Sequence, residues 1–462
     1  MMRSVELPLW LFVLIVLFAA VTFASHFLFP SVRWFFRRRL ERAVARLNER
    51  LTRPIEPFKL ARRHDMIQRL IYDPQVTEAI VAHADAEDIP ENVAFEQARR
   101  YAREIVPSFS AFAYFSFGAR AARWLATALY DVRTGLNNDQ QVQSVDTDAT
   151  VVFAMNHRSN MDYVLVTYLA ARASALSYAV GEWARVWPLS RLIKSMGAYF
   201  IRRKSRGALY RKVLARYVQM ATEGGVTQAI FPEGGLSVNG KLMPLKMGLL
   251  SYVVEGYSPD KRDVVFVPVA INYDRVLEDR VLIAADQRGD RRFGVSMTVV
   301  IAAILRLLWQ WITRRYRKFG TASVVFGPPV SLAALGPHRA LEDLAETLRG
   351  RIQDVMPVPF VPLLARLFLM SSDPIDDVDM VHRVKSAMPD GRGTRPALLD
   401  AELADRVARA LDDMLRRGMI ERTQDGWQMV PDERQLFAFY ANSIEDLYPA
   451  VPSAENAADA KS

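Results

Sequence analysis

The chain has 462 residues, of which 51% are hydrophobic and 24% are charged, so it is long and apolar enough to build two or three folded domains. It contains no cysteine, which excludes disulfides, a thiolate nucleophile and cysteine-ligated zinc or iron–sulfur sites. The net charge of +9 favours a polyanionic partner, which can be nucleic acid, an anionic membrane surface or a phosphorylated substrate.

The N-terminal segment from Leu7 to Phe29 contains no Asp, Glu, Lys or Arg and is long enough to cross a bilayer core. Arg33 and four further arginines follow it closely, so the positive-inside tendency predicts an anchor with the rest of the chain on the cytoplasmic side. A cleaved signal peptide is the alternative, but only Arg3 precedes the apolar segment. We therefore expect residues 1–32 to form a membrane anchor helix.

The pattern is helical from Arg33 to about Leu129, and we expect residues 33–140 to form a helical lead-in region. Four phenylalanines, at positions 109, 112, 115 and 117, recur at spacings that are typical of a helical core. The same aromatic series is equally compatible with an apolar groove or a membrane-facing surface. The sequence does not separate these three interpretations.

Residues 141–370 are expected to form an α/β domain, because short β-branched runs alternate there with helical stretches. The expected strands are residues 150–154, 175–180, 226–231, 264–271 and 322–326, and residues 209–222 are an expected helix. Inside this domain, residues 297–312 are almost wholly apolar. We expect that stretch to lie buried or at a membrane interface.

The C-terminal part is expected to be a separate small unit that follows a Gly/Pro-rich link at residues 389–396. Residues 398–417 have a helical pattern, and the runs 419–421 and 427–430 predict a hairpin. Helices followed by such a hairpin predict a winged-helix-like domain over residues 371–450. The Ala-rich end, residues 451–462, is expected to be a disordered tail.

The most informative motif is AMNHRSNMDY at residues 154–163, which places His157 and Asp162 five positions apart behind a buried strand. Turns at strand ends are where α/β folds keep reactive groups. His157 can take a proton near neutral pH, and a carboxylate on its other nitrogen would fix its tautomer. The alternative is an ordinary turn in which Asn160 or Asp162 caps the following helix.

Two further motifs carry cations or glycines next to short strands. GAYFIRR, residues 197–203, ends in Arg202 and Arg203, inside a run from Glu182 to Glu223 that contains ten Lys or Arg and no acid between those two glutamates. Guanidinium groups match phosphate geometry, although a solvated basic face is the alternative interpretation.

FPEGG, residues 231–235, follows a strand with Glu233 and the pair Gly234 and Gly235, and Lys241 and Lys246 lie downstream. Two adjacent glycines let backbone approach a ligand closely, although a glycine turn with an exposed glutamate is the alternative. A fourth motif, VPVAINYDRV at residues 267–276, is a buried strand that runs into a polar edge.

These four motifs, in this order and spacing, resemble the glycerolipid acyltransferase family with its HxxxxD motif, and most of all its glycerol-3-phosphate acyltransferase branch. The resemblance extends to residues 341–359 and to FAFYANSI at residues 437–444. It implies an α/β fold with a mixed sheet flanked by helices. It also implies transfer of a fatty acyl group from acyl-CoA or acyl carrier protein to the sn-1 hydroxyl of glycerol-3-phosphate, at the cytoplasmic face of a bacterial-type inner membrane.

By position, the resemblance implies that His157 is the general base and Asp162 its orienting partner. The residues expected to bind the phosphorylated acceptor are Arg158, Arg202, Arg203, Glu233, Gly234, Gly235 and Lys246. Backbone N–H groups of the His157 turn or the Gly234–Gly235 turn are candidate donors to the oxyanion. We expect no cofactor and no metal, since the six histidines are widely spaced, and we expect anionic membrane lipids but no nucleic acid as partners.

One departure from the family pattern leaves the acceptor open. The family's third motif usually carries arginines just after the double glycine, where this chain has Leu236 and Val238. Lysophosphatidate (1-acylglycerol-3-phosphate) is therefore an alternative acceptor, as is dihydroxyacetone phosphate.

Two other classes of protein are alternatives to the acyltransferase. A serine hydrolase using Ser159 would lack the GxSxG elbow. A membrane-tethered nucleic-acid-binding protein would explain the basic charge and the C-terminal hairpin. However, the acid-free run surrounds GAYFIRR, while residues 398–417 are mixed in sign.

Overall fold

The structure is a computed structural model that describes residues 8–18, 38–39, 42, 44–135, 138–171, 174–181, 189–202, 207–289, 309, 313, 316–336, 340–388 and 400–448. It divides into two compact units, Met1–Pro54 and Ile55–Ser462. In the first unit residues 9–18 are helical. Within the described ranges, no helix is both long and apolar enough to cross a membrane.

Several predicted segments fall partly or wholly outside the described residues. They are the predicted anchor apart from residues 8–18, the apolar stretch 297–312 apart from Trp309, the link 389–396 and the tail 451–462. The second unit, from Ile55 onward, contains all the motifs.

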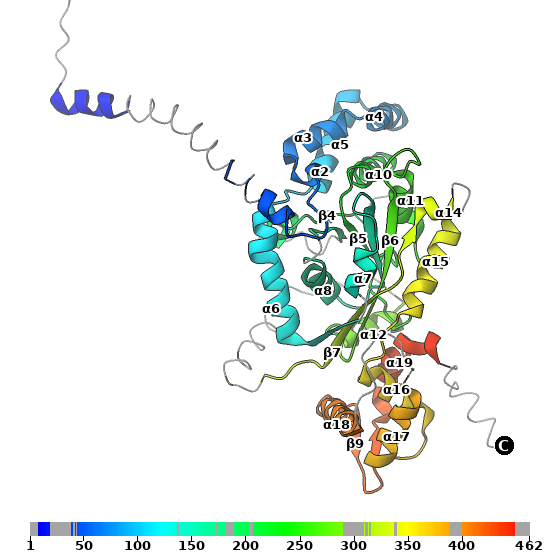
Figure 1. The fold of residues 1–462 in the computed structure, drawn as a ribbon. Coiled ribbons are helices and arrows are strands. Elements are labelled where there is room, and N and C mark those ends of the chain that lie inside the picture. The colour runs from blue at the N-terminus through cyan, green and yellow to red at the C-terminus, as the bar shows by residue number, and fades with distance from the viewer. Residues whose placement is uncertain are drawn as a thin grey trace, which may run out of the picture. The chain divides into compact units, whose positions relative to one another are not determined.

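The second unit is built around a mixed sheet of eight described strands (Figure 1). The strands are β1 Asp131–Thr134, β2 Thr150–Met155, β3 Ser177–Val180, β4 Tyr199–Phe200, β5 Gln228–Ile230, β6 Val264–Tyr273, β7 Thr321–Phe326 and β8 Val330–Ser331. Their order is β1-β7-β6-β2-β5-β3-β4, with β8 also paired to β6. The pairs from β6 through β4 are parallel, and β7 and β8 are antiparallel to β6. This mainly parallel sheet confirms the predicted α/β class.

The five predicted strands are all present, and three short strands extend the sheet. β1 pairs in parallel with β7 and lies inside the region that the sequence predicts to be helical. That prediction is wrong for residues 131–134, where the polar sequence DVRT gives no β-strand signal of its own. The edge position explains the pattern, because only one side of β1 needs a partner strand.

The helices fall into three groups along the chain. Before the sheet lie α2 Pro57–Leu60, α3 Arg63–Ile71, α4 Pro74–Glu87, α5 Glu91–Ile105, the π-helical η1 Ala113–Gly118 and α6 Ala119–Leu129. Between and after the strands lie α7 Asn138–Gln143, α8 Met161–Ala170, α9 Leu189–Ser195, α10 Ala208–Glu223, α11 Met247–Glu255, α12 Asp279–Gln287, α14 Leu332–Leu335 and α15 Leu341–Asp354. The C-terminal group contains α16 Phe360–Met370, α17 Asp377–Ala387, α18 Asp400–Arg416, the hairpin β9 Ile420–Arg422 and β10 Trp427–Met429, η3 Pro431–Glu433, α19 Arg434–Ala441 and η4 Asn442–Leu447.

The two faces of the sheet support two hydrophobic cores. On β2, Val151, Phe153 and Met155 face a core that includes α6, α8, α16 and α19. Val152 and Ala154 face the other core, with α4, α5, α10, α11 and α15 (Figure 1). Every residue of β2 is buried, as expected for a central parallel strand, which explains its continuous apolar sequence.

β7 and β8 share one edge of β6, and the break between them accommodates a proline. β8 pairs with Val265 and Phe266, whereas β7 pairs with the stretch from Val269 to Tyr273. Pro268 lies between these two ladders, where its missing N–H removes no ladder hydrogen bond. Its carbonyl still accepts the Gly327 N–H at 2.8 Å.

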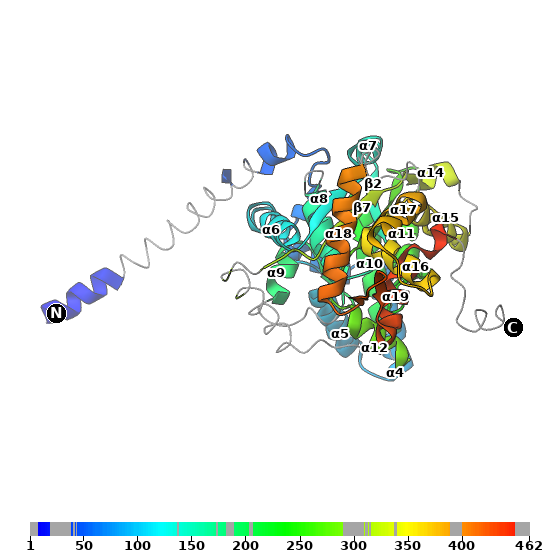
Figure 2. The same ribbon diagram turned by 90° about the horizontal axis from the view of Figure 1, so that it is seen from below.

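The C-terminal group packs at one end of the sheet, as the view from below shows (Figure 2). The predicted hairpin is present as antiparallel β9 and β10, and Trp427 of β10 bridges to Ile375. The core on the α8 side continues without interruption from the sheet into α17 and α18. The winged-helix-like comparison stays a prediction.

Gly240 fixes the contact between the loop after β5 and helix α19. Its φ is +82°, and a Cβ built at this position would lie 1.9 Å from the Phe439 carbonyl oxygen. We expect Gly240→Ala to destabilise the protein by about 1–3 kcal/mol, from backbone strain and overpacking. Urea unfolding measures the loss.

The matched control is Gly248→Ala on α11, where an added Cβ meets no atom within 4 Å. It should leave the stability of the protein equal or slightly raised. Equal unfolding midpoints for the two variants would show that the contact between this loop and α19 does not contribute to stability.

Candidate active site

The candidate site lies where three neighbouring parallel strands end. β2 is followed by His157, β5 is followed by Glu233, and β6 ends at Tyr273. Because β5, β2 and β6 are adjacent and parallel, their carboxyl ends meet at one edge of the sheet. Three motifs that are far apart in the sequence therefore come together.

His157 and Asp162 are in direct contact. Nδ1 of His157 lies 2.9 Å from Oδ2 of Asp162, which is in the first turn of α8 and is 0% exposed. The same oxygen accepts the backbone N–H groups of Arg158 at 2.7 Å and Ser159 at 3.1 Å, so it also acts as an acceptor toward His157. Nδ1 therefore carries the hydrogen, and Nε2, which has no hydrogen-bond partner among the described residues, is the basic nitrogen.

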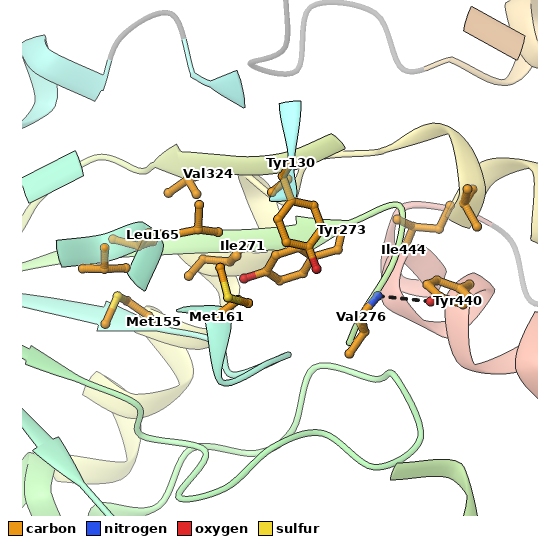
Figure 3. Packing of buried hydrophobic residues seen from close by; sticks show 14 of the residues in the cluster. Tyr130, Met155, Met161, Leu165, Ile271, Tyr273, Val276, Val324, Tyr440 and Ile444 are labelled. Carbon is orange, nitrogen blue, oxygen red and sulfur yellow. Dashed lines mark hydrogen bonds between the residues drawn. The ribbon is translucent and has the colours of Figure 1, made fainter. Parts of the chain in front are cut away.

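Tyr273 holds the other oxygen of the Asp162 carboxylate. Its hydroxyl donates to Oδ1 at 2.5 Å, and its ring packs against Tyr130 at a centroid distance of 5.4 Å (Figure 3). Burial, and after it the nearby Asp162, raises the pKa of Tyr273 well above its ordinary value. The hydroxyl therefore keeps its proton and remains a donor, which leaves Asp162 no freedom to turn.

The imidazole ring of His157 is held between aromatic rings. Phe231 stacks on it with ring centroids 4.1 Å apart, and Tyr163 meets it edge-on at 5.4 Å. His157 is buried and only 2% exposed. The polar sequence around it indicates a surface turn, whereas the aromatic residues that bury it come from α8 and from the position directly after β5.

Four successive backbone N–H groups of the turn donate to carboxylates. His157 N donates to Glu233, Arg158 N and Ser159 N donate to Asp162, and Asn160 N donates to Glu278 at 3.2 Å. These groups are therefore occupied, and the prediction that they stabilise an oxyanion is wrong for this arrangement. The N–H of Gly235 has no partner among the described residues and is the remaining candidate.

Glu278 also binds the side chains of the turn. Its Oε2 accepts the hydroxyl of Ser159 at 2.7 Å, and its Oε1 accepts the side-chain amide of Asn160 at 3.0 Å. Asn160 is the N-cap residue of α8, but its side chain makes no capping hydrogen bond. The N-terminus of α8 is therefore fixed by a residue that lies 116 positions beyond Asp162 in the sequence.

Both carboxylate oxygens of Glu233 accept hydrogen bonds from backbone N–H groups. Oε1 accepts the His157 N–H at 2.9 Å, and Oε2 accepts the Met243 N–H at 3.4 Å. Burial raises the pKa of Glu233 to about 8, against the opposing effects of Arg158 and these two hydrogen bonds. In this arrangement Glu233 supports the turn, whereas the sequence predicts a direct role in acceptor binding.

Arg158 is enclosed beneath the C-terminal segment. Its guanidinium donates through Nη2 to the Ser443 carbonyl oxygen at 3.1 Å, while its Nε and Nη1 are buried without a partner in the described part of the chain. Burial lowers the pKa of Arg158, and the nearby carboxylates of Glu233 and Asp162 oppose that change. Ser443 is held in turn by Asn272, whose side-chain amide donates to its hydroxyl at 3.1 Å.

The remaining predicted acceptor residues lie at two places. Gly234 is exposed with a φ of +71°, and a Cβ on it would lie 2.8 Å from Cδ of Lys246, so the loop and this lysine are in contact. Gly235 follows in the same loop. Arg202 follows β4, on the same edge of the sheet, but its guanidinium is paired with Glu104. Arg203 lies outside the described residues.

The Arg202–Glu104 pair is a two-pronged ion pair. Nε and Nη2 of Arg202 donate to the two Glu104 oxygens at 2.8 Å and 2.6 Å. The guanidinium carbon lies 5.5 Å from the Tyr101 ring centroid and 5.9 Å from that of Tyr210. A carboxylate therefore occupies the fork that the sequence assigns to a phosphate.

The described carboxylates and histidine of the site do not form a metal cage. Across the described ranges, no group of three or more His, Asp or Glu side chains is arranged to hold a metal ion. The cations near this edge of the sheet are Arg158, Arg202 and Lys246.

Three residues of the site were not predicted. Tyr273 lies in the polar edge that ends the fourth motif, but that pattern alone gives it no partner. Glu278 and Ser443 lie outside the four motifs. Glu278 accepts three hydrogen bonds from the turn, and Ser443 accepts one. Only their closeness in space to His157 and Asp162 reveals them, and the sequence carries no signal for it.

Comparisons with known proteins agree with the motifs. A family model described as Acyltransferase matches residues 136–272. The chain is 28% identical over 337 residues to the glycerol-3-phosphate acyltransferase of Pseudomonas putida (strain W619), covering 68% of this chain and 39% of that protein. It is 30% identical over 278 residues to the glycerol-3-phosphate acyltransferase of Pseudomonas entomophila (strain L48), covering 59% of this chain and 32% of that protein.

A solved structure, the 1-acyl-sn-glycerophosphate (LPA) acyltransferase from Thermotoga maritima, is 19% identical and covers 55% of this chain and 80% of that one. Its TM-score against this chain is 0.33. The chain spans less than two-fifths of the length of these two Pseudomonas relatives.

Glu233 makes a testable contribution to the pH dependence of stability. With its pKa raised from 4.5 to about 8, the folded protein binds a proton between those values that the unfolded chain lacks. The contribution of Glu233 to stability is therefore greatest below the unfolded pKa and falls as the pH rises toward 8. We expect Glu233→Gln to flatten this fall when urea unfolding is measured from about pH 5 to about pH 8.

Glu96→Gln, on the surface of α5, is the matched control and should keep the native pH dependence. If the stability of the Glu233→Gln variant followed the same pH dependence as that of the native protein across the whole range, Glu233 would not be a buried, protonated group in the folded protein.

Proposed function

We propose that this chain, a member of the glycerolipid acyltransferase family, transfers a fatty acyl group from acyl-CoA or acyl carrier protein to the sn-1 hydroxyl of glycerol-3-phosphate. The observation that carries the proposal is the contact of 2.9 Å between His157 Nδ1 and the Asp162 carboxylate at the end of β2. That contact orients one imidazole nitrogen and leaves the other free to accept a proton.

His157 acts as the general base in the proposed mechanism. Nε2 takes the proton of the acceptor hydroxyl while the hydroxyl oxygen attacks the thioester carbonyl carbon. Asp162 stabilises the imidazolium that forms, and Tyr273 holds Asp162 in place. Collapse of the tetrahedral intermediate breaks the C–S bond, and the imidazolium returns the proton to the departing thiolate.

The products are an ester and a free thiol, so the reaction needs no redox partner. It uses no cofactor beyond the acyl carrier and forms no acyl-enzyme. The Gly235 N–H is the candidate donor to the carbonyl oxygen as negative charge develops there. The acyl donor and the acceptor both carry phosphate, which agrees with the basic net charge of the chain.

The acceptor phosphate is proposed to bind the cations Arg202, Arg203 and Lys246. Val238, which stands where the family usually has an arginine, is buried in the core, and Leu236 packs against the same core. Neither can contact a phosphate through a charge. The proposed phosphate site therefore depends on cations outside the third motif.

Attachment to the cytoplasmic face of an inner membrane completes the proposal. It is supported by the uncharged segment from Leu7 to Phe29 and by the arginines that follow it. Anionic lipids would attract those arginines. The product of each proposed transfer is itself a lipid that belongs in the bilayer.

The function is tested by offering glycerol-3-phosphate, lysophosphatidate and dihydroxyacetone phosphate in parallel with a labelled acyl donor. We expect transfer to glycerol-3-phosphate. His157→Ala should lower turnover by about 10²–10⁴-fold, the usual contribution of general base catalysis. Asp162→Asn should also lower it, because an amide stabilises the imidazolium less.

Because the His157 ring is buried, each variant needs a melting temperature beside its turnover. His83→Ala, which removes a partly buried histidine paired with Gln97 in the lead-in, is the matched control and should keep full turnover. Near-native turnover in a folded His157→Ala variant would show that His157 is not the general base. Acylation of lysophosphatidate alone would show that lysophosphatidate, and not glycerol-3-phosphate, is the acceptor.

Arg202 and Glu104 provide a second test of the proposed site. Arg202→Ala should raise the KM for glycerol-3-phosphate about tenfold to a hundredfold, as the loss of a charge-assisted contact predicts. Glu104→Gln should lower that KM, because it removes the carboxylate that competes with phosphate for Arg202. The KM of the acyl donor should change little in both variants.

The two substitutions distinguish a binding role from a structural one. A KM for the acceptor that rises equally in both variants would mean that the ion pair only supports the fold. An unchanged KM for the acceptor in Arg202→Ala would indicate that Lys246, and not Arg202, binds the acceptor phosphate.

A further inference from the structure

Residues 112–124 expose three large aromatic side chains. Phe112 is 69% exposed, Phe117 is 57% exposed and Trp124 is 64% exposed. Phe117 and Trp124 are seven residues apart, which places them on one face of a helix, and Phe112 precedes Phe117 by about one π-helical turn. We call Phe112, Phe117 and Trp124 the aromatic face.

The opposite side of the same segment is fixed in the core. Tyr114, Ala122, Ala126 and Leu129 are buried, and the last two belong to the core that α6 shares with α8. α8 begins at Met161 and carries Asp162. The aromatic face is therefore held rigidly on the outer side of a helix that packs against the helix of the candidate site (Figure 1).

All charged residues in the segment that carries the aromatic face are arginines. No Asp or Glu occurs between Glu104 and Asp131. Arg120 and Arg123 are exposed on α6, and neither guanidinium pairs with a described residue. α9 lies against the start of the segment through the hydrogen bond from Ser110 N to Ser195 O, and it adds an exposed arginine and leucine at positions 191 and 192.

We propose that the aromatic face docks in the plane of an anionic phospholipid bilayer. Exposed Trp and Phe side chains lie at the boundary between headgroups and acyl chains, and neighbouring arginines bind lipid phosphates. The inference rests on the proposed function, because docking through α6 would keep the candidate site at the surface that receives the acylated product. It adds a second membrane contact to the N-terminal segment.

A bilayer fits the aromatic face better than an acidic carrier protein or a second copy of the chain. Three bulky rings without an acid among them match a hydrophobic boundary beneath a negative surface. A carrier protein would contact the arginines and leave the rings in water. A second copy would bring its own arginines against these ones.

The absence of cysteine allows each ring to be tested alone in the full-length chain. Phe117→Cys and Trp124→Cys, labelled with a polarity-sensitive fluorophore, are mixed with vesicles of phosphatidylglycerol and phosphatidylethanolamine. The control is Tyr72→Cys, which replaces an aromatic residue that is 66% exposed at the end of α3. We expect a blue shift and quenching by lipid-borne quencher at positions 117 and 124, and none at position 72.

The label reports docking even if residues 7–29 bind the vesicles by themselves, and it does not depend on acyl transfer. Absence of lipid quenching at 117 and 124 would overturn the proposal while leaving the proposed function intact. The same shift without vesicles at rising protein concentration would assign the face to a second copy. A shift produced by acyl carrier protein and not by vesicles would assign it to the carrier.

The arginines are tested with the same label at position 117. Arg120→Gln and Arg123→Gln should each weaken the vesicle-dependent signal about fivefold at low salt. Vesicles of phosphatidylcholine alone should give a weaker signal that these substitutions do not change. Equal signals on anionic and neutral vesicles in the unsubstituted protein would remove the role of the arginines.

Discussion

The carboxylates that bind the backbone of residues 157–160 are the constraint on which the candidate site depends. Glu233, Asp162 and Glu278 come from three different segments, and together they accept four successive N–H groups of one turn. A short polar turn has no apolar side chains of its own to hold it in one conformation. Hydrogen bonds that the backbone N–H groups donate to these carboxylates replace that packing, because an N–H group removed from water must find an acceptor. The His157 ring is therefore fixed through its own backbone and through Asp162.

The sheet makes this arrangement possible. β5, β2 and β6 are adjacent and parallel, so the segments that follow them begin at one edge, and residues after β5 and β6 contact the turn that follows β2. Glu233 follows β5, Tyr273 ends β6, and Glu278 lies just beyond it. The break between β8 and β7 at Pro268 serves the same arrangement. It lets β6 continue to Tyr273 while β8 and then β7 pair with it on one side. Positions that look independent in the sequence are neighbours for topological reasons.

The parts of the fold that could be predicted from the sequence are those whose signal is local. β2 and β6 are continuous apolar runs, and the spacing of His157 and Asp162 lies within one turn and one helix start, so all of these were found. β1 was missed because DVRT has no β-branched run and forms a strand only by pairing with β7. The burial of His157 was missed because Phe231 is 74 positions away, and the pairing of Arg202 with Glu104 was missed because 98 positions separate them. These features depend on distances in space that a sequence pattern does not contain.

The C-terminal segment completes the enclosure of the site. The family model ends at residue 272, but Ser443 accepts a hydrogen bond from Arg158, and the Tyr440 hydroxyl accepts the N–H of Val276 (Figure 3). Tyr440 in turn donates to Asp279, which also binds Arg417 at 2.6 Å, so residues on both sides of Glu278 are tied to α19 and to the loop before β9. Arg158 and Asp279 are buried charged residues. They are stabilised only while Ser443, Tyr440 and Arg417 stay in place as their partners. The stretch that holds Glu278 against the turn is therefore supported by residues from the far end of the chain, which makes the C-terminal group a part of the site and not an appendage to it.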